Sequence, residues 1–128
     1  RRARFMTATP NLTPAMLRHL VDEVDGINHV ALALVIGNEP VGVVRMIRWP
    51  NAPECADVAV TVLDEWQGLG VASLLLKRVL EVRPVGVTTI KTSVLSDNQP
   101  SLAMLERLGP TTTEVCGALT EVTVDIRD

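Results

Sequence analysis

The sequence predicts an α/β fold in which helices cover both faces of a mixed sheet. Three observations support this prediction. Turn-forming residues divide the 128 residues into alternating strand-like and helix-like pieces. Two strand–helix–strand units lie in succession along the chain, and such units join parallel strands of one sheet. Hydrophobic residues make up 47% of the chain, enough for a core without disulfide bonds. We therefore expect one domain over residues 1–128.

The first predicted elements are a helix and a β-hairpin. A Thr-Pro pair followed by one apolar stripe at helical spacing predicts a helix over 13–26. Strands are expected over 29–36 and 40–48, joined by a Gly-Asn-Glu turn at 37–39. Residues 49–53 contain two prolines and are expected to form a loop, because proline cannot donate a hydrogen bond inside a sheet.

The next strand, Asp57–Leu63, has two different faces. Three valines point to one face, while Asp57, Ala59 and Thr61 point to the other. The remaining predicted elements are a helix after Gly70 that ends before Pro84, a strand over 87–95, a helix from Asp97 to Gly109, and strands over 112–116 and 119–126.

Composition excludes several classes of protein. The net charge is −3 and the chain has three aromatic residues, none of them tyrosine, which argues against a nucleic-acid binder. Two cysteines exclude a disulfide-dense secreted scaffold and a four-cysteine zinc site, and we expect no metal. The longest apolar run, Val30–Ile36, is far shorter than the ~18 residues of a membrane helix. No signal-peptide stretch follows the N-terminal arginines, so we expect a cytoplasmic domain.

The turn after the strand Asp57–Leu63 is the most informative segment. Its pattern, Gln67-x-x-Gly70-x-Ala72, opens a helix with small residues, which let an anion approach the backbone closely. A helix N-terminus adds unpaired N–H groups and the positive end of the dipole, so a pyrophosphate fits here. The alternative is an ordinary glycine turn. The dinucleotide-binding and P-loop patterns are both absent.

At this point the sequence resembles the GNAT N-acetyltransferase superfamily. The Gln67-x-x-Gly70-x-Ala72 turn is similar to the acyl-CoA pyrophosphate loop, and residues 95–105 with Asn98 are similar to the second CoA-contacting segment. The resemblance extends from about Phe5 to the end of the chain and is strongest to the catalytic domain of bacterial Pat-type protein lysine acetyltransferases. The segments that carry the likeness to Pat are 4–6, 13–16, 24–29, 56–62 and 95–98.

The resemblance implies a twisted, mostly antiparallel GNAT-like sheet with acetyl-CoA as cosubstrate. It implies that the splayed strands 57–63 and 87–95 form the cleft between them, and that Asn98 bonds the cosubstrate or a water near the thioester. The backbone groups that would hold the acetyl carbonyl and the pantetheine arm belong to Val60, Thr61 and Val62. The residues that would hold the pyrophosphate are Gln67, Gly68, Leu69, Gly70, Val71, Ala72 and Ser73.

Against the family pattern, the N-terminus is short. Only about a dozen residues precede the helix expected at Thr13, so the family's first strand is expected to be missing. The start of the chain is then disordered, the sequence is a fragment, or another chain completes the sheet, which leaves a homo-oligomer open.

Two further departures concern catalysis. Pat-type enzymes carry Glu where this chain has Asp57, and many GNAT enzymes have a tyrosine acid at the position of Leu105, seven residues after Asn98. Lysine has a pKa of about 10.4, so a general base is useful for deprotonating an acceptor amine. Asp57 is the predicted base, acting through water because it is one methylene shorter than Glu. The alternative for Asp57 is a strand-end cap or surface charge, and Glu54 is the reserve base.

The leading functional hypothesis is therefore an N-acetyltransferase that acts on a primary amine by direct attack in a ternary complex. A protein lysine is the acceptor that the resemblance favours. The alternatives are a small-molecule amine acetyltransferase and a non-catalytic acyl-CoA-binding regulatory module. No nucleic-acid or membrane partner is expected.

Overall fold

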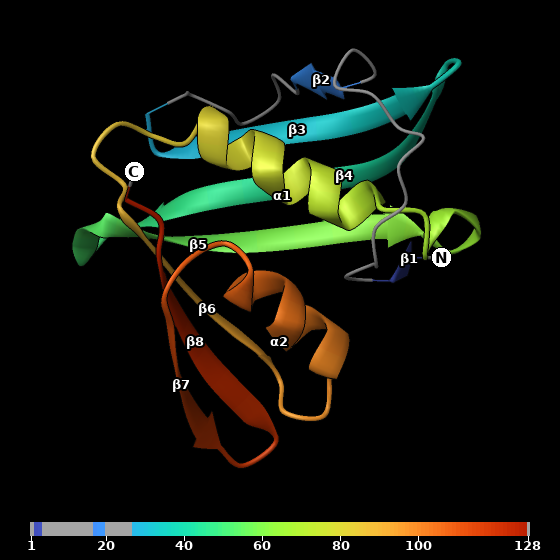
Figure 1. Ribbon diagram of the computed structural model, residues 1–128. Helices are drawn as coiled ribbons and strands as arrows, with labels where there is room; N and C mark the ends of the chain where they lie inside the picture. Colours follow the sequence, from blue (N-terminus) through green and yellow to red (C-terminus); the bar gives the residue numbers. More distant parts are fainter. Residues whose placement is uncertain (1, 4–16, 20–26, 128) are drawn as a thin grey trace.

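The computed structural model describes residues 2–3, 17–19 and 27–127 (Figure 1). The strands are β1 (Arg2–Ala3), β2 (Leu17–His19), β3 (His29–Ile36), β4 (Glu39–Trp49), β5 (Ala52–Leu63), β6 (Thr89–Leu95), β7 (Thr111–Cys116) and β8 (Leu119–Asp125). The helices are α1 (Val71–Glu81), α2 (Gln99–Glu106) and a 3-10 turn, η2 (Asp64–Trp66).

The strands form one mixed, mostly antiparallel sheet. Its order is β2-β3-β4-β5-β6-β8-β7, and β1 pairs separately with β5. Only β5 and β6 are paired in parallel among the described strands. This arrangement confirms the predicted fold class. No helix in the described part of the chain has the length and hydropathy of a membrane span.

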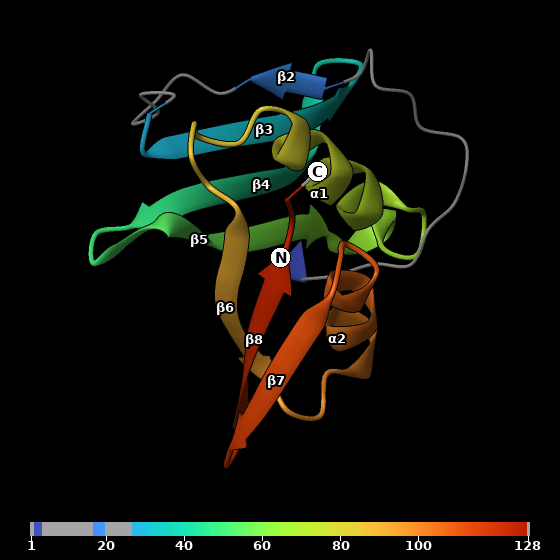
Figure 2. The same ribbon diagram turned by 60° about the vertical axis from the view of Figure 1, so that its left-hand side comes forward.

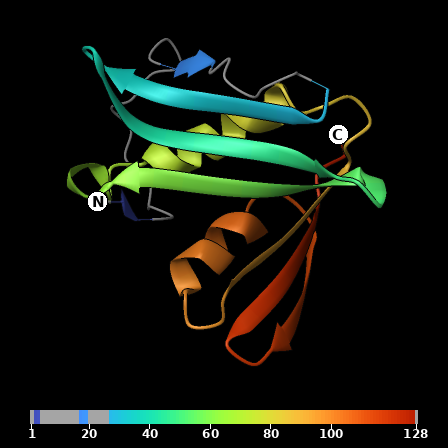
Figure 3. The ribbon, with the colours of Figure 1, turned by 180° about the vertical axis from the view of Figure 1, so that it is seen from behind.

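The described helices share one core. α1 packs on β3, β4 and β5, and α2 packs on β8 (Figure 2). The apolar side chains of both helices belong to a single buried cluster. Gly42 of β4 permits the close approach of α1, because a Cβ there would lie 2.7 Å from the Val71 side chain. The sheet twists strongly, so that β6, β8 and β7 turn away from the β3–β5 half (Figure 3).

Two predicted elements are corrected. Leu17–His19, expected within the helix over 13–26, form the short strand β2 and pair antiparallel with Leu32–Leu34 of β3. The open edge of β3 offers ladder hydrogen bonds, and such tertiary pairing overrides helical periodicity. The rest of the predicted helix lies outside the described residues.

The predicted loop at 49–53 is also wrong. β4 continues to Trp49 and β5 begins at Ala52, which leaves only a two-residue turn between them. Pro53 is tolerated because the register shifts between Arg48 and Trp49, so that no β4 residue pairs with it. The Pro53 carbonyl instead accepts a 2.6 Å hydrogen bond from the Arg48 guanidinium.

Gly109 lies where the chain passes β8 at very close range. A Cβ on Gly109 would overlap the Asp125 carbonyl oxygen, which belongs to rigid backbone. We expect Gly109→Ala to lower the free energy of unfolding by about 1–3 kcal/mol, as overpacking does elsewhere. Denaturant unfolding measures this. Gly117→Ala serves as the reference for backbone strain alone, because Gly117 has a φ of 67° and a Cβ there meets nothing within 4 Å. Wild-type stability in Gly109→Ala would contradict the close approach.

Candidate active site

The site begins where the β5–β6 ladder stops. These strands pair only through Cys55 with Thr89 and Ala56 with Ile90, and then diverge. The Ile126 N–H donates to the Thr88 carbonyl at 2.9 Å, so the Thr88 carbonyl points toward β8. The backbone N–H and C=O groups of every second residue after Thr88 then also point toward β8. Alternation along β6 therefore turns the N–H and C=O of Lys91 toward β5. If the parallel ladder continued, its next bond would join the Val58 N–H to the Lys91 carbonyl.

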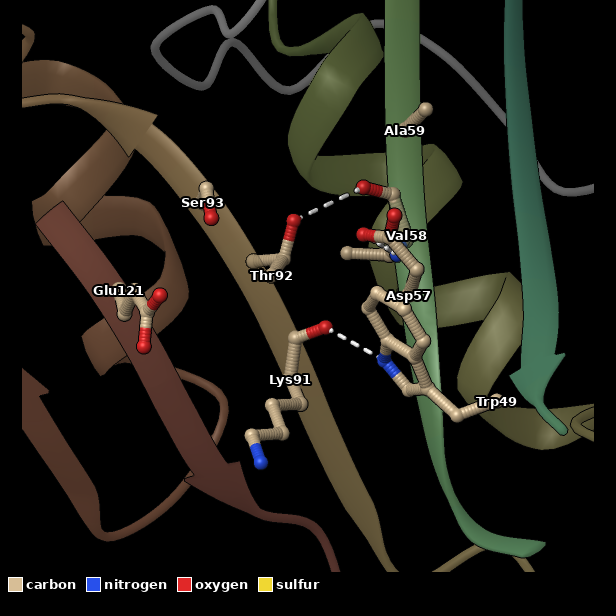
Figure 4. A pocket seen from close by; sticks show the side chains of 8 residues that line it. All are labelled: Trp49, Asp57, Val58, Ala59, Lys91, Thr92, Ser93 and Glu121. Carbon is tan, nitrogen blue, oxygen red and sulfur yellow. Dashed lines mark hydrogen bonds between the residues drawn. The ribbon is translucent and has the colours of Figure 1, made fainter. Parts of the chain in front are cut away.

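Side chains satisfy both of these backbone groups instead. The Val58 N–H donates to Oδ1 of Asp57 at 2.8 Å, and the Lys91 carbonyl accepts from Nε1 of Trp49 at 2.9 Å (Figure 4). A longer contact, 3.5 Å, joins the Thr92 hydroxyl to the Val58 carbonyl. The two strands thus separate without leaving the Val58 N–H or the Lys91 carbonyl unbonded.

A pocket of about 350 Å³ lies at this divergence. We call it the β5–β6 pocket; its lining residues are Trp49, Asp57, Val58, Ala59, Lys91, Thr92, Ser93 and Glu121. Asp57, Lys91 and Glu121 are its charged members, so it carries one net negative charge. Within the described residues, none of these three side chains forms an ion pair.

The structure places the two predicted base candidates differently. Asp57 is half-buried in the pocket, on the polar face predicted for its strand, while Val58 on the other face is buried. The Val58 N–H holds Oδ1, and the structure gives Oδ2 no partner in the described part of the chain. Glu54 is exposed and lies outside the pocket lining. The geometry therefore favours Asp57 over Glu54 as the general base.

Glu121 extends the negative charge along this face of the sheet. It lies directly opposite Glu114 in the β7–β8 ladder. Desolvation of the sulfur, followed by the charges of these two carboxylates, raises the pKa of the Cys116 thiol. A cation would find a favourable potential at this side of the pocket.

The N-terminus of α1 forms a second part of the site. Gly70 is its N-cap with φ of 87°, and its carbonyl accepts the first helical bond from the Leu74 N–H at 3.0 Å. The N–H groups of the first turn therefore have no partner within the helix. No side chain caps them, and the first turn has no acidic residue. An anion such as a pyrophosphate fits this end of the helix.

Comparison with known proteins identifies the family. Residues 5–109 match the profile described as the Acetyltransferase (GNAT) family. The chain belongs to this family. GNAT enzymes use acetyl-CoA as cosubstrate.

Two curated relatives share about a third of their aligned residues with this chain. Acetyltransferase Pat of Mycolicibacterium smegmatis is 32% identical over 100 residues, covering 76% of this chain and 30% of that protein. L-2,4-diaminobutyric acid acetyltransferase of Methylotuvimicrobium alcaliphilum is 32% identical over 108 residues, covering 82% of this chain and 62% of that protein. The chain therefore spans less than two thirds of the length of either relative.

Solved structures agree on the fold. The GNAT domain of S. lividans PAT has a TM-score of 0.69 at 28% identity, covering 79% of this chain and 62% of that chain. The protein yncA from Salmonella typhimurium, solved with its cofactor acetyl-CoA, has a TM-score of 0.66 at 18% identity, covering 78% of this chain and 66% of that chain.

The GNAT site residues expected on β5 differ in their backbone directions. Alternation turns the N–H and C=O of Val60 and Val62 toward the divergence from β6, but those of Thr61 toward β4. Val62 is paired with Ala3 of β1. Among the three expected residues, Val60 therefore offers the open backbone edge for a cosubstrate.

Two other residues expected to bind the cosubstrate, Asn98 and Gln67, already form side-chain hydrogen bonds within the protein. Asn98 is the N-cap of α2, where its Oδ1 accepts from the Ser101 N–H at 3.2 Å. Gln67 donates its side-chain amide to Asp64 at 3.0 Å. Leu105, at the position of the GNAT tyrosine, is fully buried in the core. The Ser101 hydroxyl, close to Asn98, is fully buried and has no partner in the described part of the chain.

Sequence reasoning did not single out Trp49, Lys91 or Glu121 as site residues, although it placed Lys91 on a strand that borders the cleft. Trp49 was expected in a loop, and Lys91 and Glu121 are ordinary polar residues on alternating strands. Lys91 and Glu121 lie 30 positions apart and meet through strand order, which no local pattern contains. The sequence feature that could have indicated Glu121 is its alternation with the buried valines of the same strand. This alternation places Glu121 on a sheet face that none of the described helices covers.

Proposed function

We propose that this chain is an N-acetyltransferase that transfers the acetyl group of acetyl-CoA to a primary amine. The observation that carries the proposal is the Asp57 carboxylate, held by the Val58 N–H inside the pocket where β5 and β6 diverge. This position supports Asp57 as a base beside the backbone edge that an acyl-CoA arm would use.

The residues present fit acetyl-CoA. The unpaired N–H groups at the start of α1, from Val71 to Ser73, would hold the pyrophosphate, and Gly70 leaves room for it. The Val60 backbone would bond the pantetheine arm, while Asn98 and the unpartnered Ser101 hydroxyl lie on the α2 side. When bound, acetyl-CoA supplies the activated acyl group and a thiolate as leaving group.

The chemistry assigned to Asp57 is removal of one proton from the acceptor. At pH 7 only about one lysine amine in 2,500 is neutral, so an unassisted attack costs roughly 4–5 kcal/mol. Asp57 accepts this proton through a water molecule. The leaving thiol, with a pKa near 8.5, needs about 2 kcal/mol of help from an acid, which water supplies without a tyrosine.

The acceptor proposed first is a lysine side chain of a protein. The likeness to acetyltransferase Pat supports it, as does the negative side of the pocket formed by Asp57 and Glu121. The second candidate is a small diamine, which the likeness to the diaminobutyric acid enzyme favours. Lys91 in the same pocket would then face the carboxylate of such a substrate.

The test offers both acceptors to the purified chain. Acetyl-CoA is supplied with a lysine-rich protein in one reaction and with 2,4-diaminobutyrate in another, and mass spectrometry detects acetylated products. Acetylated lysines support the first candidate and acetyl-diaminobutyrate the second. Tight CoA binding without transfer to either acceptor would contradict the enzyme and indicate a non-catalytic binding module.

A further inference from the structure

Trp49 makes an unusual contact across a strand. It is the last residue of β4, and β5 lies between β4 and β6 in the sheet. Its indole nevertheless reaches over β5 and donates from Nε1 to the Lys91 carbonyl of β6 at 2.9 Å (Figure 4). The residue remains 40% exposed. Burial alone therefore does not hold the ring in place, and the hydrogen bond gives it a defined partner.

The neighbouring Arg48 fixes the hairpin that carries Trp49. Its guanidinium donates to the Ile27 and Val85 carbonyls, both at 2.8 Å, and to the Pro53 carbonyl at 2.6 Å. Two of these bonds join the end of β4 to Ile27, which precedes β3, and to Val85, in the loop before β6. Hydrogen bonds from Arg48 thus hold in place the backbone that carries the indole.

The bond from Trp49 takes the place of a ladder bond. A continued β5–β6 ladder would pair the Lys91 carbonyl with the Val58 N–H, which instead donates to Asp57. As long as the indole holds the carbonyl, the Val58 N–H has no competing acceptor. The Asp57 carboxylate then stays oriented, and the strands stay apart at the pocket.

We infer that Trp49 is a positioning residue: its indole N–H keeps β5 and β6 apart and thereby orients Asp57. Without that N–H, the Lys91 carbonyl takes the Val58 N–H as its donor. The ladder grows by one step, the pocket narrows, and Asp57 loses its fixed rotamer. The consequence for catalysis rests on the proposed function, whereas the consequence for backbone bonding does not.

The test removes the N–H in two ways. Trp49→Phe keeps an aromatic ring, and β-(3-benzothienyl)alanine at position 49 keeps the shape of the indole but has no N–H. Trp66→Phe, at the other tryptophan, controls for the loss of an indole from the protein. NMR measures the coupling through the hydrogen bond between the Val58 amide nitrogen and the Lys91 carbonyl carbon.

The coupling should be absent in the wild type and in Trp66→Phe, and present in both variants at position 49. In those two variants we expect kcat to fall about 10- to 100-fold, as a misplaced catalytic group does, with KM for acetyl-CoA unchanged. An absent coupling, or an unchanged kcat beside a new coupling, would overturn the inference. A wild type that acetylates no amine refutes the proposed function alone, since the coupling still decides the bonding of Lys91.

Discussion

Asp57→Asn is expected to lower kcat/KM for acetyl transfer about 10²–10⁴-fold, the usual contribution of a positioned general base. Asparagine keeps the size of the side chain and an oxygen that can accept from the Val58 N–H, so the pocket should keep its shape. Only basicity is lost. The dissociation constant of CoA should remain at the wild-type value, because the proposed CoA contacts lie elsewhere.

Two further variants sharpen this measurement. Asp57→Glu should retain activity, since it restores the longer carboxylate of the resembled Pat-type enzymes. Glu54→Gln removes a nearby carboxylate outside the pocket and should leave the rate unchanged. If Asp57→Asn works at the wild-type rate between about pH 6 and pH 9, Asp57 is not the base. Glu121, the other carboxylate of the pocket, or bulk water then takes that role.

Gly70→Asp is expected to raise the dissociation constant of CoA by at least about 10²-fold, because two effects add. A carboxylate next to the pyrophosphate repels it by up to about 4 kcal/mol at 4 Å and an effective dielectric of about 20. It also competes for the N–H groups of the α1 N-terminus, whose attraction for an anion is worth up to about 2 kcal/mol. Titration calorimetry with CoA measures the loss.

Backbone strain is separated from charge by two controls. Gly70 has φ of 87°, so any side chain there costs about 1–2 kcal/mol of stability. Gly70→Asn carries the same strain without the charge and should bind CoA more tightly than Gly70→Asp. Gly37→Asp adds the same charge at another left-handed position, in open space, and should bind CoA as the wild type does. Unchanged affinity in a folded Gly70→Asp would refute the pyrophosphate position.

Several features of the site follow from local sequence alone. The period-2 pattern around Asp57 placed it on the polar face of its strand, and the structure confirms this. The glycine-containing turn before α1 predicted an open helix N-terminus, and Gly70 forms it. These features depend on side chains within a few residues of one another, and periodicity and turn preferences act over that range.

Other features required the folded sheet. The strand at Leu17–His19 exists because β3 has an open edge, and Pro53 enters β5 because the register shifts beside it. The sequence thus determined most of the strands and helices around the site, except at residues 49–53, and which face of the strand at Asp57 is polar. The tertiary structure decided that Trp49 reaches Lys91 and that Glu121 shares a pocket with Asp57. The physical reason is that strand order, register and twist bring distant residues together, and none of these is encoded in a local pattern.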